Sequence, residues 1–299
     1  MTLHCWTSAR YTIALPTNHR FPIAKYALLR DAVIASGLVA PATIHEPERA
    51  SIESLRLVHT ERYVQAVVSG TLSEAEQRRI GLPWSESLVE RSFRAVGGTC
   101  EAAAAALDRG LTMNLAGGTH HAFPDHGEGF CVFNDVAVAV RSLQREARIR
   151  RAVVIDLDVH QGNGTHAVFA GDPSVFTFSM HGGRNYPFHK VPGSLDVELP
   201  DGTGDEAYLG ALAEVLPRVL SASAPDLAIY LAGADSHEGD RLGRLCLTFD
   251  GLARRDVMVL DACREVGIPV AITIAGGYGR NIEDSVHVHL NTVRIATQY

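Results

Sequence analysis

The strongest constraint on the fold is a set of five short apolar runs, each followed at once by glycine or by side chains capable of chemistry. These runs are Met113–Ala116, Ala152–Leu157, Val175–Ser179, Leu227–Ala232 and Val270–Ala275. Segments with helical patterning lie between or beside them: Ser85–Arg109, Asp135–Glu146, Asp205–Leu220, Thr248–Val266 and Asn281–Thr297. Short strands that alternate with longer helices are typical of parallel βαβ construction. We therefore predict an α/β fold with one parallel β-sheet and helices on both of its faces.

The organisation along the chain favours one domain. The 299 residues suffice for one large α/β domain or for two small ones. No internal repeat, low-complexity tract or long linker divides the chain, and we expect Pro41–Pro47 to be a short connection between elements. The simplest prediction is a single catalytic domain over residues 1–299.

Charge and cysteine content narrow the classes of function. The net charge of −7 argues against a nucleic-acid partner and is compatible with a cationic substrate or a basic peptide. The five cysteines are scattered and show no CxxC pairing, so we expect reduced thiols. No apolar run approaches the ~18 residues that a membrane span requires. The segment from Met1 to Leu15 lacks the layout of a secretory signal, and a cytoplasmic location is therefore expected.

Polar residues follow all five predicted strands. They are Gly117–His121, the group Asp156, Asp158 and His160, the segment Met180–Gly183, the segment Gly233–Asp235, and Gly276–Gly279. Parallel α/β sheets place their sites at the carboxyl ends of the strands. The pattern therefore predicts one active site at that edge of the sheet.

Two carboxylates and one imidazole in this set are candidate metal ligands. Asp158 and His160 are two residues apart, so on an extended segment they face the same side. Taken alone, this pair could equally be a buried aspartate that caps a turn beside a histidine. Asp235 supplies a third ligand, and three protein ligands leave the open position of a catalytic zinc.

The remaining polar residues suit acid–base chemistry. The adjacent His120 and His121 could supply a base for water and an acid for a leaving amine. Asp156 and Asn163 are available to orient their outer ring nitrogens. Tyr278, in a glycine-rich turn, could donate a hydrogen bond to an oxyanion, although a lone tyrosine in such a turn is more often a core residue.

Four ordered sequence motifs resemble the histone deacetylase family. They are GGTHHAFPDHGEGFCVFND (Gly117–Asp135), IDLDVHQGNG (Ile155–Gly164), AGADSHEGDRLGRL (Ala232–Leu245) and AGGYG (Ala275–Gly279). The resemblance extends from about Phe21 to the C-terminus. The form of the second motif, with Asn163 where many members carry aspartate, together with EGDRLGRL, is most similar to the class IV branch and its bacterial relatives. The fold that this implies is the single-domain arginase/deacetylase-like fold.

The resemblance assigns roles to individual residues. Asp158, His160 and Asp235 match the zinc ligands, His120 and His121 the tandem catalytic histidines, Asp156 and Asn163 their partners, and Tyr278 the tyrosine that polarises the carbonyl. Residues matched to the acyl-lysine channel are Gly129, Phe130, Tyr186 or Phe188, Gly276 and Gly277. Structural potassium ions are also implied, with candidate ligands at Asp156, Asp158, His160, Ser179 and Met180 for one ion and at Phe169, Asp172 and Val175 for a second.

The implied activity is hydrolysis of the amide of an acyl-lysine, or of a similar acylated amine, with one zinc ion per chain. The acyl length, the amine, the oligomeric state, the identity of the base and the choice between zinc and ferrous iron stay open. Alternatives are a binuclear manganese ureohydrolase-like enzyme, an acetylpolyamine amidohydrolase, and an inactive module that only binds acylated ligands. The ureohydrolase needs further carboxylates, and the residue two past Asp235 is His237.

Overall fold

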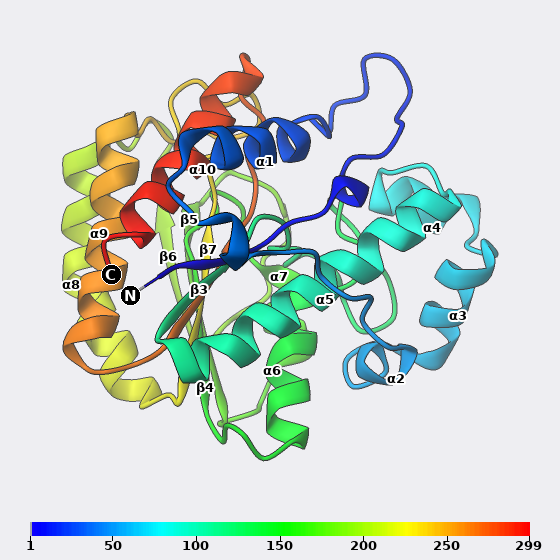
Figure 1. Ribbon diagram of the computed structural model, residues 1–299, viewed down its shortest axis with the longest axis horizontal. Coiled ribbons are helices and arrows are strands. Elements are labelled where there is room, and N and C mark those ends of the chain that lie inside the picture. The colour runs from blue at the N-terminus through cyan, green and yellow to red at the C-terminus, as the bar shows by residue number, and fades with distance from the viewer. Residues whose placement is uncertain (1) are drawn as a thin grey trace.

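A computed structural model describes residues 2–299 and contains one eight-stranded sheet whose strands are all parallel. The strands, in chain order, are β1 (His4–Trp6), β2 (Ile44–His45), β3 (Leu111–Asn114), β4 (Ala152–Asp156), β5 (Val175–Gly182), β6 (Leu195–Leu199), β7 (Leu227–Ala232) and β8 (Val270–Ile274). Their order across the sheet is β2-β1-β3-β8-β7-β4-β5-β6 (Figure 1). The last two strands of the chain are therefore inserted between the third and the fourth.

Helices cover both faces of the sheet, as the alternation predicts. The α-helices are α1 (Lys25–Ser36), α2 (Ile52–Leu55), α3 (Glu61–Ser69), α4 (Glu74–Ile80), α5 (Glu86–Arg109), α6 (Asp135–Arg145), α7 (Asn163–Val168), α8 (Asp205–Ser223), α9 (Phe249–Glu265) and α10 (Ile282–Ala296). Helices α8, α9 and α10 lie on one side of the sheet and α5 and α6 on the other, with α2, α3 and α4 beyond α5 (Figure 1). None of the described helices is both long and apolar enough to cross a membrane.

The five predicted strands and five predicted helices are confirmed, with ends that shift by a few residues. The prediction for Pro41–Pro47 is wrong in part, because this stretch contains a 3₁₀ turn (Pro41–Thr43) and the edge strand β2, which pairs with β1. Strands β1, β2 and β6 and helices α1 to α4 and α7 are not among the predicted elements. Most of these are short, and a two- or three-residue strand has no detectable period.

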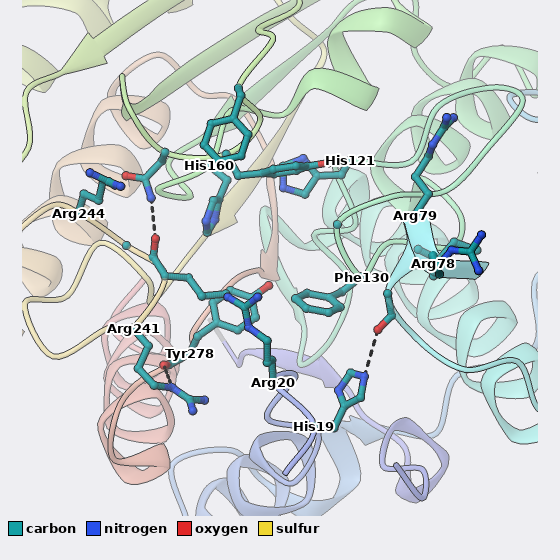
Figure 2. A pocket seen from close by; sticks show the side chains of 18 of the residues that line it. His19, Arg20, Arg78, Arg79, His121, Phe130, His160, Arg241, Arg244 and Tyr278 are labelled. Carbon is teal, nitrogen blue, oxygen red and sulfur yellow. Dashed lines mark hydrogen bonds between the residues drawn. The ribbon is translucent and has the colours of Figure 1, made fainter. Parts of the chain in front are cut away.

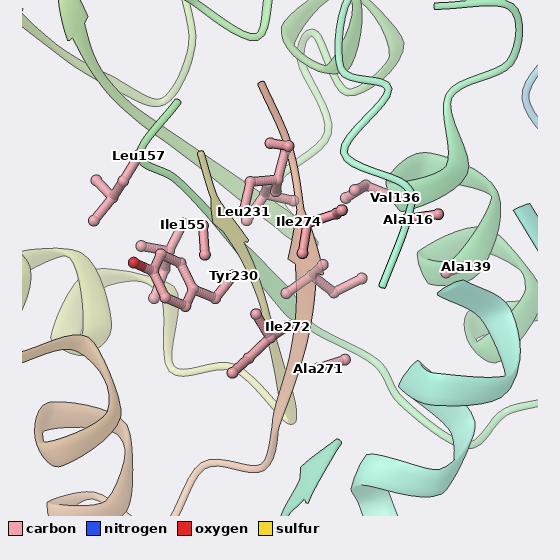
Figure 3. Close-up of a cluster of buried hydrophobic side chains, with 14 of the residues drawn as sticks. Ala116, Val136, Ala139, Ile155, Leu157, Tyr230, Leu231, Ala271, Ile272 and Ile274 are labelled. Atoms are coloured by element: carbon pink, nitrogen blue, oxygen red, sulfur yellow. The ribbon is translucent and has the colours of Figure 1, made fainter. Parts of the chain in front are cut away.

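The core is made by side chains that alternate across the central strands. In β7, every residue is buried, as expected for a parallel strand covered on both faces. Figure 3 shows Tyr230 and Ile155 on one side of the strands and Val136 and Ala139 of α6 on the other. The Tyr230 hydroxyl donates to Asp256 of α9 at 2.5 Å, which satisfies a polar group inside the core.

The sheet order places the predicted site. Strands β3, β8, β7 and β4 are direct neighbours in the centre of the sheet. His120 follows β3, Tyr278 follows β8, Asp235 follows β7 and Asp158 follows β4. Because the strands are parallel, these four residues leave the sheet at the same edge.

Candidate active site

The three candidate metal ligands converge in the structure. Nδ1 of His160 lies 3.0 Å from Oδ1 of Asp158 and 3.1 Å from Oδ2 of Asp235. Donor atoms of all three residues lie within 4.8 Å of one another, and all three side chains are buried. Tetrahedral ligands about 2.0–2.2 Å from a zinc ion are about 3.4 Å apart, so the donor set is close to the size that zinc needs.

Backbone groups hold the carboxylates in this arrangement. The Val159 N–H donates to Oδ1 of Asp235 at 2.9 Å, and the Gly276 N–H donates to Oδ2 of Asp158 at 2.6 Å. A side chain at Gly276 would place its Cβ 1.7 Å from an Asp235 oxygen, so only glycine fits there. Burial, with the charge of Asp158, raises the pKa of Asp235 to about 7. A divalent cation between the two carboxylates would remove this repulsion, so the residues fit a metal ion.

The first histidine of the tandem pair faces a carboxylate. Nδ1 of His120 lies 2.7 Å from Oδ2 of Asp156, and both side chains are buried. Burial alone would lower the pKa of His120, but the carboxylates of Asp156 and Asp158 outweigh it and raise the pKa to about 9. Burial also raises the pKa of Asp156, so the two buried groups hold a proton between them.

The second histidine faces an amide instead. Nδ1 of His121 lies 2.7 Å from Oδ1 of Asn163, whose Nδ2 donates to Oε1 of Glu128 at 2.6 Å. The bond to Glu128 fixes which end of the amide is oxygen, so His121 must donate from Nδ1 and keeps the lone pair of Nε2. Burial, together with the charges of His120 and His160, lowers the pKa of His121 well below its ordinary value.

Tyr278 is held by the loop that follows β7. Its N–H donates to Oδ2 of Asp240 at 2.6 Å, and its carbonyl accepts from Nε of Arg241 at 3.0 Å. Its ring lies 6.1 Å from the His160 ring, centre to centre. The Tyr278 hydroxyl has no hydrogen bond within residues 2–299, which leaves it available to a ligand.

Three residues of the site form the floor of a cavity of about 1040 Å³. His121, His160 and Tyr278 reach it from different strands, and Figure 2 shows them around one space with Phe130 at its side. The cavity is also lined by Gly129, Phe130, Tyr186 and Phe188 among the residues matched to the channel.

The channel candidates lie at different depths. The Tyr186 ring packs edge-on against His121, with ring centres 4.9 Å apart. Phe188, in contrast, is 81% exposed at the mouth. Gly276 and Gly277 do not line this cavity; they lie against Asp235 and against Ala234 and Ser285, respectively.

The residues matched to potassium ligands fall into two places. Asp156 and Ser179 are paired neighbours on β4 and β5, and the Ser179 hydroxyl is 2.9 Å from Nδ1 of His181. At the second place, the carbonyls of Phe169 and Asp172 already accept backbone N–H groups from Asp172 and Val175. A carbonyl oxygen has a second lone pair, so these bonds leave room for a cation.

Two positioning residues are not singled out by the sequence patterns. Glu128 fixes the amide of Asn163, and Asp240 accepts the backbone N–H groups of Tyr278, Leu242 and Gly243. Both lie inside the quoted motifs, but an acidic residue in a loop carries no sign of the group that it holds. Their long-range partners become visible only in the fold.

The sheet and the site together define a class of protein. A parallel α/β sheet that brings an Asp–His–Asp group, two histidines and a tyrosine to its carboxyl edge is the arrangement of a hydrolase on the arginase/deacetylase fold. A model of the family described as the histone deacetylase domain matches residues 19–293. The chain belongs to the histone deacetylase family, whose members generally depend on zinc and act on acetylated substrates.

Individual relatives agree with this assignment. An uncharacterized protein of Picosynechococcus is 48% identical over 93% of this chain and 93% of its own length. Histone deacetylase 2 of Arabidopsis thaliana is 34% identical over 90% of this chain and 73% of its own. A crystal structure of the HDA15 HD domain is 25% identical, covers 99% of this chain and 88% of its own, and superposes with a TM-score of 0.83.

Proposed function

We propose that this protein is a zinc-dependent deacylase that hydrolyses the amide of an acyl-lysine or of a similar acylated amine. The observation that carries the proposal is the different partnering of two adjacent buried histidines beside one Asp–His–Asp group. His120 faces the carboxylate of Asp156, and His121 faces the amide of Asn163. Neighbouring titratable groups held in different environments are a pointer to acid–base roles, because one of them keeps a free lone pair while the other is held beside a carboxylate. The proposal treats residues 1–299 as one catalytic domain.

His121 is the base in this mechanism. Of the two tandem histidines, His121 is the one that lines the cavity, and its Nε2 carries the lone pair. It takes a proton from the attacking water and, once charged, can return that proton to the departing amine. His120 is oriented by Asp156 and, in its charged form, would stabilise negative charge that develops in the cavity.

Tyr278 and the metal ligands act on the carbonyl. The Tyr278 hydroxyl donates a hydrogen bond to the oxyanion as the tetrahedral carbon forms. When held by Asp158, His160 and Asp235, zinc would supply a Lewis acid for the carbonyl and for water. Ferrous iron accepts the same nitrogen and oxygen donors. Potassium at the two places described above would stiffen the loop that follows β4 and the segment between α7 and β5.

The test is a substrate panel run on protein loaded with zinc and, separately, with ferrous iron. The panel joins acetyl and longer acyl groups to a lysine peptide and to a polyamine, and the free amine is measured. We expect turnover of the acyl-lysine peptides, with Asp235→Ala protein as the inactive control. Cleavage of the polyamine amide alone would favour the acetylpolyamine alternative, and an absence of cleavage from all amides would overturn the proposal.

Nothing specific favours the binuclear ureohydrolase. His237, two residues past Asp235, stacks on Phe249 with ring centres 4.2 Å apart. His237 therefore packs against the first residue of α9 and is not a further ligand beside Asp158, His160 and Asp235. Two metal ions per chain in the loaded protein would reverse this conclusion.

A further inference from the structure

The mouth of the cavity carries charge of one sign. Of its lining residues, six are arginines and none is aspartate or glutamate: Arg20, Arg78, Arg79, Arg184, Arg241 and Arg244. They come from separate segments, namely the loop before α1, the end of α4, and the loops after β5 and β7. The chain as a whole has a net charge of −7, so this concentration of positive charge opposes the average.

Carboxylates outside the lining offset only part of this charge. Arg78 pairs with Glu74 at 3.0 Å, and Arg244 pairs with Asp201 at 3.0 Å. Arg184 lies 4.0 Å from the same Asp201, so a single negative charge is shared by two guanidinium groups. These six arginines, here called the arginine rim, therefore keep an excess of positive charge at the mouth.

Three of the arginines have no carboxylate within 4.0 Å among residues 2–299: Arg20, Arg79 and Arg241. Arg20 and Arg79 are exposed. The Nε of Arg241 donates a hydrogen bond to the Tyr278 carbonyl. Figure 2 shows Arg20 beside Tyr278, with Arg241 on one side of the space between His160, Phe130 and Tyr278 and Arg79 on the other. A guanidinium group presents a planar set of donors that matches a carboxylate.

We propose that the arginine rim selects an acylated lysine that is flanked by acidic residues in a peptide or protein. This inference rests on the proposed function, because the acylated side chain must enter the cavity and leave its neighbours at the mouth. Carboxylates on either side of the lysine then meet the arginines. A basic segment, which the overall charge of the chain would suit, is repelled at this position.

The position of the arginines separates this substrate from other anions. The reacting carbonyl belongs at the floor, beside His160 and Tyr278, whereas the arginines stand around the opening. The charge they recognise is therefore on the amine side of the scissile bond and not in the acyl group. The net charge of −7 over the whole chain also argues against a nucleic acid as the partner.

The experiment uses one acetyl-lysine peptide in three forms, with flanking glutamates, glutamines or arginines. Zinc-loaded protein is assayed for kcat/KM at low and at high salt. We expect the glutamate peptide to exceed the glutamine peptide by about tenfold or more at low salt, with the arginine peptide last, because steering by a charged cleft has this size. The differences should shrink at high salt.

Binding is measured separately, by fluorescence anisotropy of the three labelled peptides on Tyr278→Phe protein, which should turn over slowly. In an Arg20→Gln/Arg79→Gln variant, the ratio of glutamate to glutamine peptide should fall toward one in both measurements. Arg218→Gln is the matched control, because Arg218 is exposed on α8 and does not line the cavity. That variant should keep the preference.

The arginine rim would be excluded as the selector if the three peptides ranked equally or in reverse order, or if the ratio of glutamate to glutamine peptide stayed unchanged in the double variant. A faster reaction with succinyl-lysine than with acetyl-lysine in the glutamine peptide would place the recognised charge in the acyl group. Stronger competition by a DNA duplex than by an acidic peptide would point to a nucleic acid as the ligand. Either result would overturn the proposal. If no peptide is hydrolysed, the deacylase proposal fails, while the binding order still decides whether the rim prefers acidic flanks.

Discussion

The proposed metal group consists of three side chains, and no other group of three candidate ligands is found among residues 2–299. Asp235 contributes an oxygen beside Nδ1 of His160, and its other oxygen is fixed by the Val159 N–H. We expect Asp235→Ala to lose both the bound divalent ion, about one per chain, and the activity, because two ligands hold zinc far more weakly than three. Metal analysis after gel filtration measures the first, and the peptide assay measures the second.

The matched control for this change is Asp250→Ala. Asp250 is exposed in the first turn of α9, and the variant should bind metal and react as the parent does. Full activity in metal-free Asp235→Ala protein would contradict the metal mechanism.

Tyr278 tests the oxyanion role directly. We expect Tyr278→Phe to keep its fold and its metal and to lose about a hundredfold or more in kcat, because one oxyanion donor is removed. The loss should fall on kcat more than on peptide affinity. Tyr299→Phe, at the C-terminus, is the control and should be unaffected. Normal turnover by Tyr278→Phe protein would make Tyr278 a packing residue.

Helix α5 shows at the scale of an element why glycine sits where helix propensity disfavours it. Gly97 lies in the middle of this helix, and a Cβ there would be 1.9 Å from the backbone oxygen of Glu48. Gly97→Ala should therefore destabilise the protein by about 1–3 kcal/mol, because the Glu48 backbone must move. Urea unfolding followed by circular dichroism measures the change.

Gly210 is the matched comparison, because it is also inside a long helix, α8, yet a methyl group at this position would meet nothing within 4 Å. Gly210→Ala should stabilise the protein by about 0.5–1 kcal/mol, the usual gain in helix propensity. The two variants should thus differ in sign. A stabilising Gly97→Ala would show that the Glu48 segment can move at little cost.

The start of α4 gives a pH-dependent prediction. Ser73 and Glu76 form a capping box, and Arg62 pairs with Glu76 at 2.8 Å. The hydrogen bond from Arg62, followed by those from the backbone and hydroxyl of Ser73, lowers the pKa of Glu76 from 4.5 to about 2. A carboxyl whose pKa is lowered on folding contributes its full stability above the unfolded pKa and loses it as pH falls toward the folded one.

Glu76→Gln should therefore be less stable than the parent at pH 7, and the difference should shrink as pH falls from about 4.5 toward about 2. Ser73→Ala should cost about 1 kcal/mol at pH 7, as for other N-cap serines. Urea unfolding at a series of pH values measures both. A constant difference between Glu76→Gln and the parent across the acid range would exclude the carboxylate as its origin.

For the molecule as a whole, the sequence predicts the class of fold because the strands carry two signals at once. Each central strand is an apolar run, and each ends in residues such as Asp158 or Asp235 that have no role in a core. The rule that parallel strands end at one edge then brings these residues together without knowledge of the strand order. The structure places the three proposed metal ligands within 4.8 Å of one another.

The strand order itself is not contained in such patterns. Insertion of β7 and β8 between β3 and β4 makes His120, Tyr278, Asp235 and Asp158 neighbours, and this depends on crossover connections over both faces of the sheet. The arginine rim also cannot be predicted from the sequence, because its members, such as Arg20 and Arg244, are far apart along the chain. Net charge, which is a sum over the whole surface, has no information on where the charge lies.

The cavity size leads to a last prediction, on the length of the acyl chain. From the resemblance to the class IV branch, and from the glycine and proline in Gly182–Gly193 and Pro124–Glu128 that could open an apolar pocket beside the metal, the sequence predicts tolerance of acyl chains longer than acetyl. Tyr186 of the first of these segments packs against His121 inside the cavity, which Ile80, Phe130 and Leu242 also line, whereas Phe188 is exposed at the mouth. Its volume of about 1040 Å³ is at the upper end of ordinary ligand pockets, and more than an acetyl-lysine fills.

We therefore expect kcat/KM for butyryl and octanoyl groups on one lysine peptide to equal or exceed the value for acetyl. Each methylene that is buried against these apolar side chains contributes up to about 0.8 kcal/mol, so even partial burial of a longer chain changes the order of substrates. The series of acetyl, butyryl, octanoyl and myristoyl peptides, kept below their aggregation limits, measures the effect. Phe130→Ala should reduce the preference for octanoyl more than the rate on acetyl, because it removes an apolar wall of the cavity. A steady fall in kcat/KM from acetyl onward would show that the space beside the metal is closed to the acyl chain and that the cavity volume belongs to the mouth, where the peptide binds.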